Sequence, residues 1–322
     1  MKLRTTALAA MLAAIAAPTQ AGDFTSLLIG TGPGPDGIWG NANDTDAILP
    51  GLDGVLGTSD DTTVKVTGAN APAGDKLYLE TLGFTTMAGN ANIATSLNYA
   101  ATEWRTAAQQ GVPAANAVPR GTYTAFGTLN LLDYRVTTNL ALGSDLIGDV
   151  YDFVYRDTRD NKLVFGTRFI LGQEAAYADD AELNYMYRYG FVEGDTVFEA
   201  DAAWAFFSDF DLRLYNASRS NVRALTGIPT LDLNSIALQA DVNLSEGNPF
   251  SGLYLLKTDA QDWKLLDGAI GYYQAGEEGQ ALLFGSVAGF APTAPIPEPS
   301  EYAMFLAGLG LIGLVARRRM RV

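Results

Sequence analysis

Between residues 121 and 291 the chain alternates short apolar or aromatic runs with turn residues about every ten positions, and few fold classes accommodate this pattern. In residues 236–244 every second residue is apolar, as in a strand with one buried face. We therefore predict a mainly β fold with an antiparallel β-sandwich-like body. A barrel and an irregular β domain are the alternatives.

One hairpin can be placed within this pattern. Residues 149–156 alternate apolar and polar side chains, residues 157–161 are a polar turn, and residues 162–171 form the returning strand. The further strands that we expect cover residues 182–189, 196–207, 211–215, 236–244, 252–257, 269–273 and 281–287.

A helix is expected before the β domain, near residues 91–110. Its apolar residues recur at spacings of three and four positions, which places them on one helical face: Ile93, Leu97, Ala100, Trp104, Ala107 and Ala108. Gly111 and Pro113 would end this helix, and residues 111–120 would connect it to the β domain.

Two residue types are absent from the sequence, and their absence limits the catalytic and metal sites that the protein can form. The 322 residues include no Cys and no His. Disulfides, thiolate and imidazole metal sites, thiol nucleophiles and a Ser-His-Asp triad are therefore excluded. The formal net charge of −15 argues against nucleic acid or an anionic membrane surface as the main partner. No catalytic residue is predicted.

The first 21 residues predict a secretory signal peptide. Lys2 and Arg4 give a charged start, and residues 7–17 are a short apolar run. Residues 19–21 offer small side chains at the −3 and −1 positions of a cleavage after Ala21. An ordinary buried helix is the alternative. The order of charge, apolar run and small residues favours export.

Three unlike elements follow one another at the C-terminus. Residues 292–299 are rich in proline and cannot form a helix. The apolar run at residues 302–316 is shorter than the about 20 residues that span a typical bilayer, which favours a short or transient transmembrane helix. The last element is a cluster of arginines, which the positive-inside rule keeps in the cytoplasm while the body lies outside: Arg317, Arg318, Arg319 and Arg321.

These three elements, beginning at Pro297-Glu298-Pro299-Ser300, resemble the PEP-CTERM sorting signal. The resemblance covers residues 297–322 and implies that Pro297, Glu298 and Pro299 are the recognition motif. It also implies that an exosortase in the inner membrane removes the tail, in a Gram-negative bacterium that makes exopolysaccharide. A simple C-terminal membrane anchor is the alternative. The resemblance assigns no role to the preceding residues, because proteins with this tail have unrelated bodies.

A short internal repeat lies in an acidic, glycine-rich segment near the N-terminus. Residues 36–45 align with residues 53–62 through the pattern D-G-apolar-apolar-G-x-x-[ND]-D-T. Side-chain oxygens and glycine-exposed carbonyls are what calcium requires. The candidate ligands are Asp36, Asn43, Asp44, Asp53, Asp60 and Asp61, with Asn41 and Asp46 as weaker ones. The other interpretation is a pair of exposed Asp-Gly turns.

Two other groups of side chains bear on function. Tyrosines that could stack on sugar rings are clustered, although tyrosine is also a common strand residue: Tyr185, Tyr187, Tyr189, Tyr272 and Tyr273. Acids that could form a glycosidase pair lie mostly beside turns, where solvated charge is ordinary: Asp179, Asp180, Glu182, Glu193, Asp195 and Glu199.

Several arginines lie in predicted strands and are expected to form cross-strand ion pairs with aspartates. Arg168 and Arg188 are flanked by apolar residues, so burial would require each to be paired.

These features divide the chain into five parts: a signal peptide (1–21), an acidic repeat segment (22–68), a helix-containing segment (69–120), a β domain (121–291) and a sorting signal (292–322). We expect an exported, exosortase-processed protein of the cell surface or exopolysaccharide matrix, transiently held in the inner membrane. Its expected role is structural or adhesive and non-enzymatic, with calcium as the one candidate cofactor. The alternative is a secreted carbohydrate-active enzyme or a glycan-binding module.

Overall fold

The computed structural model describes residues 24–27, 47–49, 59, 62–64, 77–101, 126–221, 230–274 and 282–294. Within these residues the regular structure consists of β-strands and contains no helix, which confirms the predicted mainly β fold. The predicted signal and transmembrane helices lie outside the described residues.

Of the strands that the structure describes, ten form the larger sheet, in the order β1-β12-β19-β8-β7-β6-β5-β4, with β13 and β18 beside β8. Their bounds are β1 Thr25–Ser26, β4 Leu79–Met87, β5 Asn90–Ala101, β6 Phe126–Leu142, β7 Asp145–Asp157, β8 Leu163–Leu171, β12 Asp201–Ala205, β13 Asp211–Leu212, β18 Phe250–Ser251 and β19 Leu253–Thr258. The predicted hairpin is confirmed by the antiparallel pairing of β7 with β8, in which Arg156 lies opposite Leu163.

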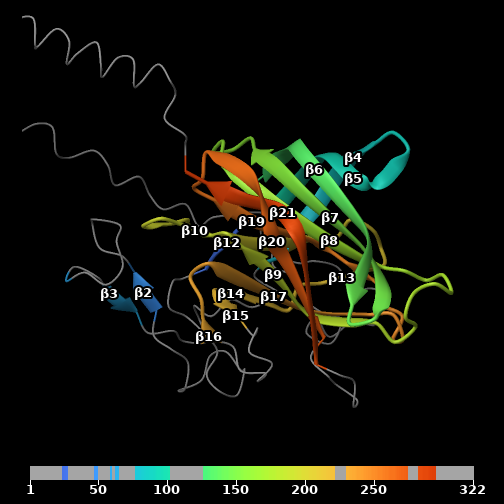
Figure 1. The fold of residues 1–322 in the computed structure, drawn as a ribbon. Coiled ribbons are helices and arrows are strands. Elements are labelled where there is room, and N and C mark those ends of the chain that lie inside the picture. The colour runs from blue at the N-terminus through green and yellow to red at the C-terminus, as the bar shows by residue number, and fades with distance from the viewer. Residues whose placement is uncertain are drawn as a thin grey trace, which may run out of the picture.

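The larger sheet is curled, so that the residues just before β4, the last strand in its order, contact β12, the second strand in that order. The backbone N–H of Trp204 in β12 donates to the carbonyl of Leu77 at 2.7 Å, and Tyr78 forms a parallel bridge with Trp204. Figure 1 shows the long strands β6, β7 and β8 in green, with β4 and β5 in cyan at the far side of the curl. The sandwich prediction therefore holds only in part, because one sheet closes on itself.

The smaller sheet contains five of the described strands, in the order β14-β17-β9-β20-β21. Their bounds are β9 Glu182–Tyr189, β14 Asn216–Ser218, β17 Ser235–Asn243, β20 Asp262–Gln274 and β21 Leu283–Thr293. Three described two-stranded pairs complete the structure: β2 Ala47–Leu49 with β3 Thr62–Val64, β10 Val192–Glu193 with β11 Thr196–Val197, and β15 Ser220–Asn221 with β16 Thr230–Leu231.

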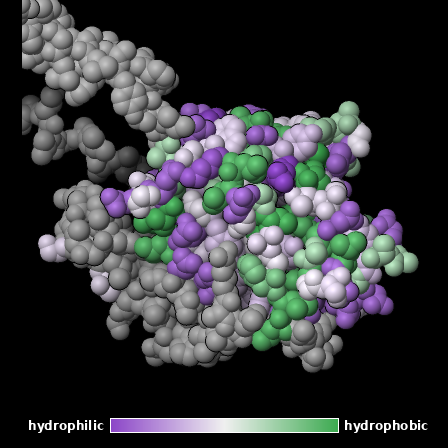
Figure 2. All heavy atoms as spheres, viewed as in Figure 1, coloured by the Kyte–Doolittle hydropathy of each residue, from purple (hydrophilic) through white to green (hydrophobic). Residues whose placement is uncertain are grey.

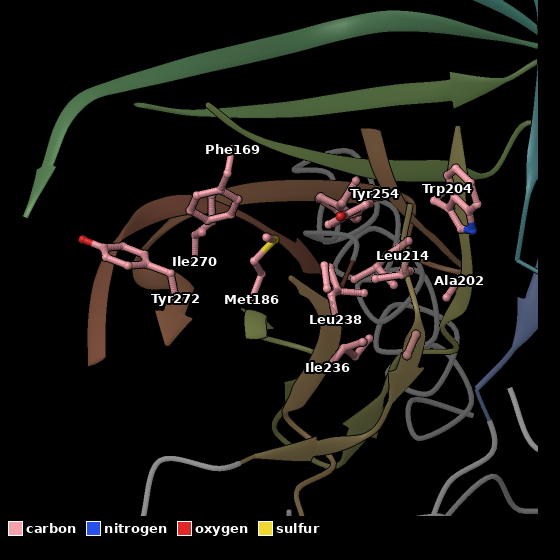
Figure 3. Packing of buried hydrophobic residues seen from close by; sticks show 14 of the residues in the cluster. Phe169, Met186, Ala202, Trp204, Leu214, Ile236, Leu238, Tyr254, Ile270 and Tyr272 are labelled. Atoms are coloured by element: carbon pink, nitrogen blue, oxygen red, sulfur yellow. The ribbon is translucent and has the colours of Figure 1, made fainter. Parts of the chain in front are cut away.

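One hydrophobic core lies between the two sheets. Phe169 and Tyr254 enter it from the larger sheet, and Met186, Leu238 and Ile270 enter it from the smaller sheet (Figure 3). The apolar side chains that alternate along β17 belong to this core, as the sequence predicted.

A second hydrophobic core lies inside the curl of the larger sheet. Leu97 in β5, Phe153 in β7 and Leu255 in β19 belong to it, so the strands of this sheet bury side chains on both faces. On the surface, hydrophobic and hydrophilic residues are interspersed on the face shown in Figure 2. Such scattered exposure is normal for a folded protein.

The predicted helix near residues 91–110 is wrong where the structure describes it, because residues 90–101 form β5. Ile93 and Leu97 are four residues apart, and an even spacing also places two residues on one face of a strand. Leu97, Tyr99 and Ala101 then continue at intervals of two and are all buried. Pairing with β4 and β6 therefore decides the conformation. Residues 102–110 lie outside the described residues.

Candidate functional site

The end of β21 is where the folded body meets the proline-rich C-terminal segment. β21 is an edge strand of the smaller sheet, and its last residues pair with the start of β20: Pro292 lies opposite Trp263 and Thr293 opposite Asp262. Proline lacks a backbone N–H, and an edge strand tolerates this loss. β21 ends at Thr293, and Ala294 follows it as the last described residue.

Glu193, at the end of β10, contacts the last two described residues. Its Oε2 accepts hydrogen bonds from Thr293 Oγ1 at 2.8 Å and from the Ala294 backbone N–H at 2.6 Å. Its Oε1 accepts a hydrogen bond from Lys264 Nζ in β20. We call Glu193, Lys264, Thr293 and Ala294 the C-terminal cluster. It joins β10, β20 and the end of β21 through one carboxylate.

Glu193 is strongly acidic in this arrangement. The hydrogen bond from Lys264, followed by those from Ala294 and Thr293, lowers the pKa of Glu193 to about 2. About a third of the Glu193 side-chain surface remains exposed, at 31%. Solvent therefore screens the ion pair, and its contribution to stability is modest.

A second attachment of β21 lies four residues upstream and is buried between the sheets. Asp152 Oδ2 accepts a hydrogen bond from the Phe290 backbone N–H at 2.6 Å, and the guanidinium of Arg188 donates to the Phe290 carbonyl. Arg188 also pairs with Asp152 and donates to Thr167 Oγ1 at 2.8 Å. Burial raises the pKa of Asp152, and the charge of Arg188 opposes that rise.

Gly289 permits this approach of Asp152 to the β21 backbone. A Cβ at position 289 would lie 2.8 Å from Asp152 Oδ2 and 2.6 Å from Ile270 Cγ1. These separations are shorter than van der Waals contact. A side chain at position 289 would therefore displace the carboxylate that holds Phe290.

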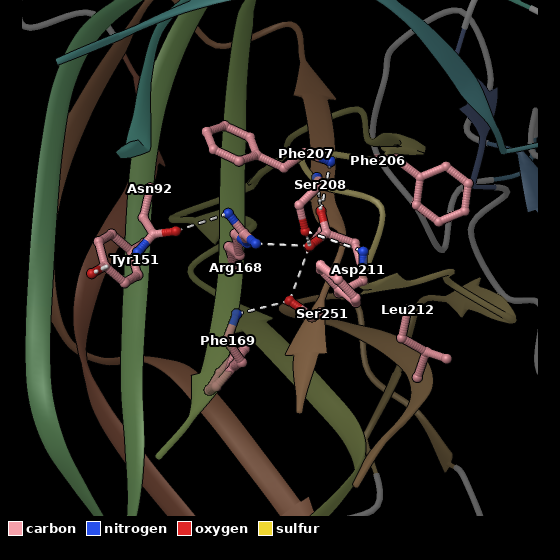
Figure 4. A network of polar contacts seen from close by, with 12 residues as sticks. Asn92, Tyr151, Arg168, Phe169, Phe206, Phe207, Ser208, Asp211, Leu212 and Ser251 are labelled. Atoms are coloured by element: carbon pink, nitrogen blue, oxygen red, sulfur yellow. Dashed lines mark hydrogen bonds and ion pairs between the residues drawn. The ribbon is translucent and has the colours of Figure 1, made fainter. Parts of the chain in front are cut away.

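Arg168 is buried inside the curl of the larger sheet and is paired there with Asp211 at 2.7 Å. Asn92 accepts a hydrogen bond from the other side of the guanidinium at 3.2 Å, and the ring of Phe207 lies 4.6 Å from it (Figure 4). Asp211 Oδ2 also accepts the backbone N–H of Phe207 at 2.6 Å. Burial lowers the pKa of Arg168, and Asp211 opposes this shift. The expectation that a buried Arg168 or Arg188 must be paired is confirmed.

Lys257 and Asp157 form a further buried pair inside the curl, at 2.6 Å. The Tyr99 hydroxyl donates to the same Asp157 oxygen at 2.7 Å, and burial followed by this hydrogen bond raises the pKa of Tyr99. The Lys257 ammonium lies 5.0 Å from the ring of Phe24. This pair therefore connects β19 to the first described residue.

Three of the candidate glycosidase acids each have a partner of their own. Glu193 belongs to the C-terminal cluster, and Glu199 pairs with Lys162 at 3.2 Å on the surface. Glu182 is buried and accepts a hydrogen bond from Asn184. The other three, Asp179, Asp180 and Asp195, lie on exposed turns.

The clustered tyrosines are divided between the two faces of the smaller sheet. Tyr185, Tyr187 and Tyr189 stack along β9, with ring centroids 6.3 and 6.0 Å apart. Tyr187 and Tyr273, on this face, are 0% and 1% exposed, so their rings are not open to a sugar. Tyr272 points into the core between the sheets, as adjacent strand residues must alternate.

The sequence pattern did not single out the acids and lysines whose ion pairs join the strands of the body: Asp152, Asp157, Asp211, Lys257 and Lys264. A signal was available for Asp152, which lies within the apolar and aromatic run of β7. A carboxylate in such a run needs a partner when it is buried.

The remaining predicted site residues lie outside the described residues. They are the calcium candidates Asp36, Asn43, Asp44, Asp53, Asp60 and Asp61, the motif Pro297, Glu298 and Pro299, and the cluster Arg317, Arg318, Arg319 and Arg321. Among the described residues, no group of three or more acids is arranged to hold a metal ion. In the same part of the chain, no helix has the length and apolarity to cross a membrane.

Comparison with known proteins identifies the C-terminal segment. Residues 295–319 match the PEP-CTERM protein-sorting motif, which confirms the predicted resemblance. Such a motif implies that the protein is exported to the cell surface or extracellular space and processed by an exosortase. Neither the curated proteins nor the solved structures gave a match. The motif begins directly after Ala294, the residue that Glu193 binds.

Proposed function

We propose that this chain is an exported protein of the cell surface or exopolysaccharide matrix with a structural or adhesive, non-catalytic role. The observation that carries the proposal is the sorting motif at residues 295–319, which adjoins a β body whose last strand is held by side chains. In this proposal the C-terminal segment directs sorting and is then removed, and the β body is the part of the protein that acts outside the cell.

The order of elements in the tail supports a transient stage in the inner membrane. The short apolar run at residues 302–316 would enter the bilayer, and the arginines after it would stay in the cytoplasm. The β body would then lie outside, with the recognition motif at Pro297–Pro299 between the body and the membrane.

Truncation of the tail tests this route. We predict that removal of residues 317–322 leaves uncleaved, mislocalised precursor, because the positive charge that would hold the C-terminus in the cytoplasm is then absent. Replacement of the four arginines by lysine is the control, because it keeps the charge and should permit processing. Immunoblots of membrane and extracellular fractions give the result. Normal release of the truncated chain would contradict the proposal.

The structural role draws support from the way in which the candidate chemical groups are used. Acids of the described body form structural contacts: Glu193 and Asp152 accept hydrogen bonds from the backbone at the end of β21. The tyrosines of β9 stack on one another and are largely buried. A glycan array with the purified protein tests the alternative, because saturable binding or hydrolysis of a glycan would favour a glycan-binding or carbohydrate-active body.

Calcium binding by the acidic repeat is the second part of the proposal. The first repeat ends at residue 45, two positions before β2 begins at Ala47, and the second ends at Thr62, which lies opposite Leu49 in the β2–β3 pair. Both repeats thus end close to one pair of strands, which would give their oxygens a common support.

A thermal shift measurement tests the calcium proposal. We predict that millimolar calcium raises the Tm of the purified protein, because a ligand that binds the folded state stabilises it. The triple variant Asp53→Asn, Asp60→Asn and Asp61→Asn should lose this shift. Magnesium is the control cation, since it tolerates flexible oxygen sites poorly. An unchanged Tm in calcium would remove the metal site from the account.

A further inference from the structure

The last five described residues are attached by side chains from other elements as well as by the ladder with β20. Phe290 is held through its N–H and its carbonyl by Asp152 and Arg188. Thr293 and Ala294 are held by Glu193. β21 is an edge strand, so backbone pairing is available on one side of it only.

Pro292 lies midway between Phe290 and Ala294, so its missing N–H falls on the side of β21 that faces away from β20. Proline donates no backbone hydrogen bond, and the motif that begins at residue 295 contains three further prolines in its first five residues. The Ala294 N–H therefore depends on Glu193 for its hydrogen bond. Without that carboxylate, the nearest side-chain attachment upstream is the buried one at Phe290.

We propose that Glu193 is a positioning residue that holds the end of β21, at Thr293 and Ala294, in place, so that the sorting motif at residues 295–319 follows a fixed strand end. The processed protein then keeps β21 intact while the tail is removed. Lys264 supports this role, because it fixes the other oxygen of the Glu193 carboxylate and joins it to β20. The consequence for processing rests on the proposed function, whereas the attachment itself rests on the described contacts alone.

Hydrogen exchange on the full-length chain in detergent tests the attachment. A peptide that spans residues 288–295 reports the amides of Phe290, Ala291, Thr293 and Ala294, since its first two residues lose their label after cleavage and Pro292 and Pro295 have no N–H. In Glu193→Ala we expect the Ala294 amide to exchange about tenfold faster, while Phe290 keeps its protection. Glu199→Ala is the matched control, because Glu199 is a carboxylate close to Glu193 in the sequence that pairs with Lys162 instead.

The C-terminal mass of the exported product tests the consequence. We expect wild type and Glu199→Ala each to give one C-terminus at or beyond residue 294, and Glu193→Ala to give a mixture that extends back toward Phe290. Glu193→Gln keeps an acceptor for the Ala294 N–H and should largely restore the single end. A loss of stability alone would lower the Tm of the variant without moving this end.

The two measurements separate the two proposals. If exchange at Ala294 depends on Glu193 but no variant loses its tail in the cell, the attachment stands and exosortase processing fails. If the tail is removed but Glu193→Ala matches wild type in exchange and in C-terminal mass, processing stands and the positioning role of Glu193 is overturned.

Discussion

The two ends of the described body are attached by different chemistry. At the start, Phe24 is buried in the core inside the curl, and Leu27 is buried between the sheets. The guanidinium of Arg219 donates to the Leu27 carbonyl at 3.4 Å, and the Leu27 N–H donates to the Ala200 carbonyl at 2.8 Å. At the finish, carboxylates accept the N–H groups of Phe290 and Ala294.

This difference makes the two ends respond differently to acid. The start depends on apolar burial and on Arg219, whose pKa burial lowers to about 10, so that it stays charged at neutral and acidic pH. The finish includes Glu193, whose ionised form makes the contacts. The end nearest the sorting motif is therefore the one that combines partial exposure with a titratable acid.

The largest effect is expected for the buried pair that holds Phe290. Asp152→Ala leaves Arg188 buried without its carboxylate, and should lower the free energy of unfolding by about 3–5 kcal/mol. Urea unfolding followed by tyrosine and tryptophan fluorescence measures this loss. The double variant Asp152→Leu, Arg188→Met should be less destabilised than the single variant. The opposite order would show that the pair does not act as a unit.

A smaller effect is expected at the start of the body. Phe24→Ala removes a buried ring that packs edge-on against Tyr99 and lies beside Lys257, which should cost about 3 kcal/mol in urea unfolding. Phe210→Ala is the control, because the Phe210 ring is 76% exposed and should change stability by less than about 0.5 kcal/mol. Equal effects of the two substitutions would mean that Phe24 is not part of the core.

The smallest effect, and the most specific one, is expected at Glu193. Glu193→Ala should cost no more than about 1 kcal/mol near pH 7, because the ion pair is partly exposed. The pKa of Glu193 is about 2 in the fold and 4.5 when unperturbed. Ionised Glu193 therefore stabilises the fold above pH 4.5, and this contribution is lost as the pH falls from 4.5 toward 2.

The pH dependence separates the two ends. The stability difference between wild type and Glu193→Ala should shrink across that acidic range, whereas the difference between wild type and Phe24→Ala should stay constant. Chemical unfolding at several pH values measures both differences. A pH-independent difference for Glu193→Ala would contradict the ionised contacts described for the C-terminal cluster.

The strands of the β body could be predicted where the pattern is local. The hairpin of β7 and β8, the extent of β9 and the buried face of β17 follow from alternation and turn residues. The pattern at β5 was ambiguous, because spacings of four fit a helix and a strand alike. Its neighbours β4 and β6 resolve this ambiguity.

The contacts that define the C-terminal cluster could not be predicted, because they join residues far apart in sequence. Glu193 and Ala294 are separated by 101 positions, and Asp152 and Phe290 by 138. The sequence places Glu193 only among the acids that could form a catalytic pair. No local property of the sequence distinguishes it from Glu199, which ends up on the surface beside Lys162.

The central claim is that the exported β body keeps β21 and Ala294, and that the sorting motif at residues 295–319 belongs to a segment that is removed. Intact mass and C-terminal sequencing of the protein recovered from the cell surface test this claim most directly. The account predicts a chain that retains Ala294 and lacks Arg317 and the residues after it. A surface protein that still carries those arginines, or one that ends within β21, would contradict it.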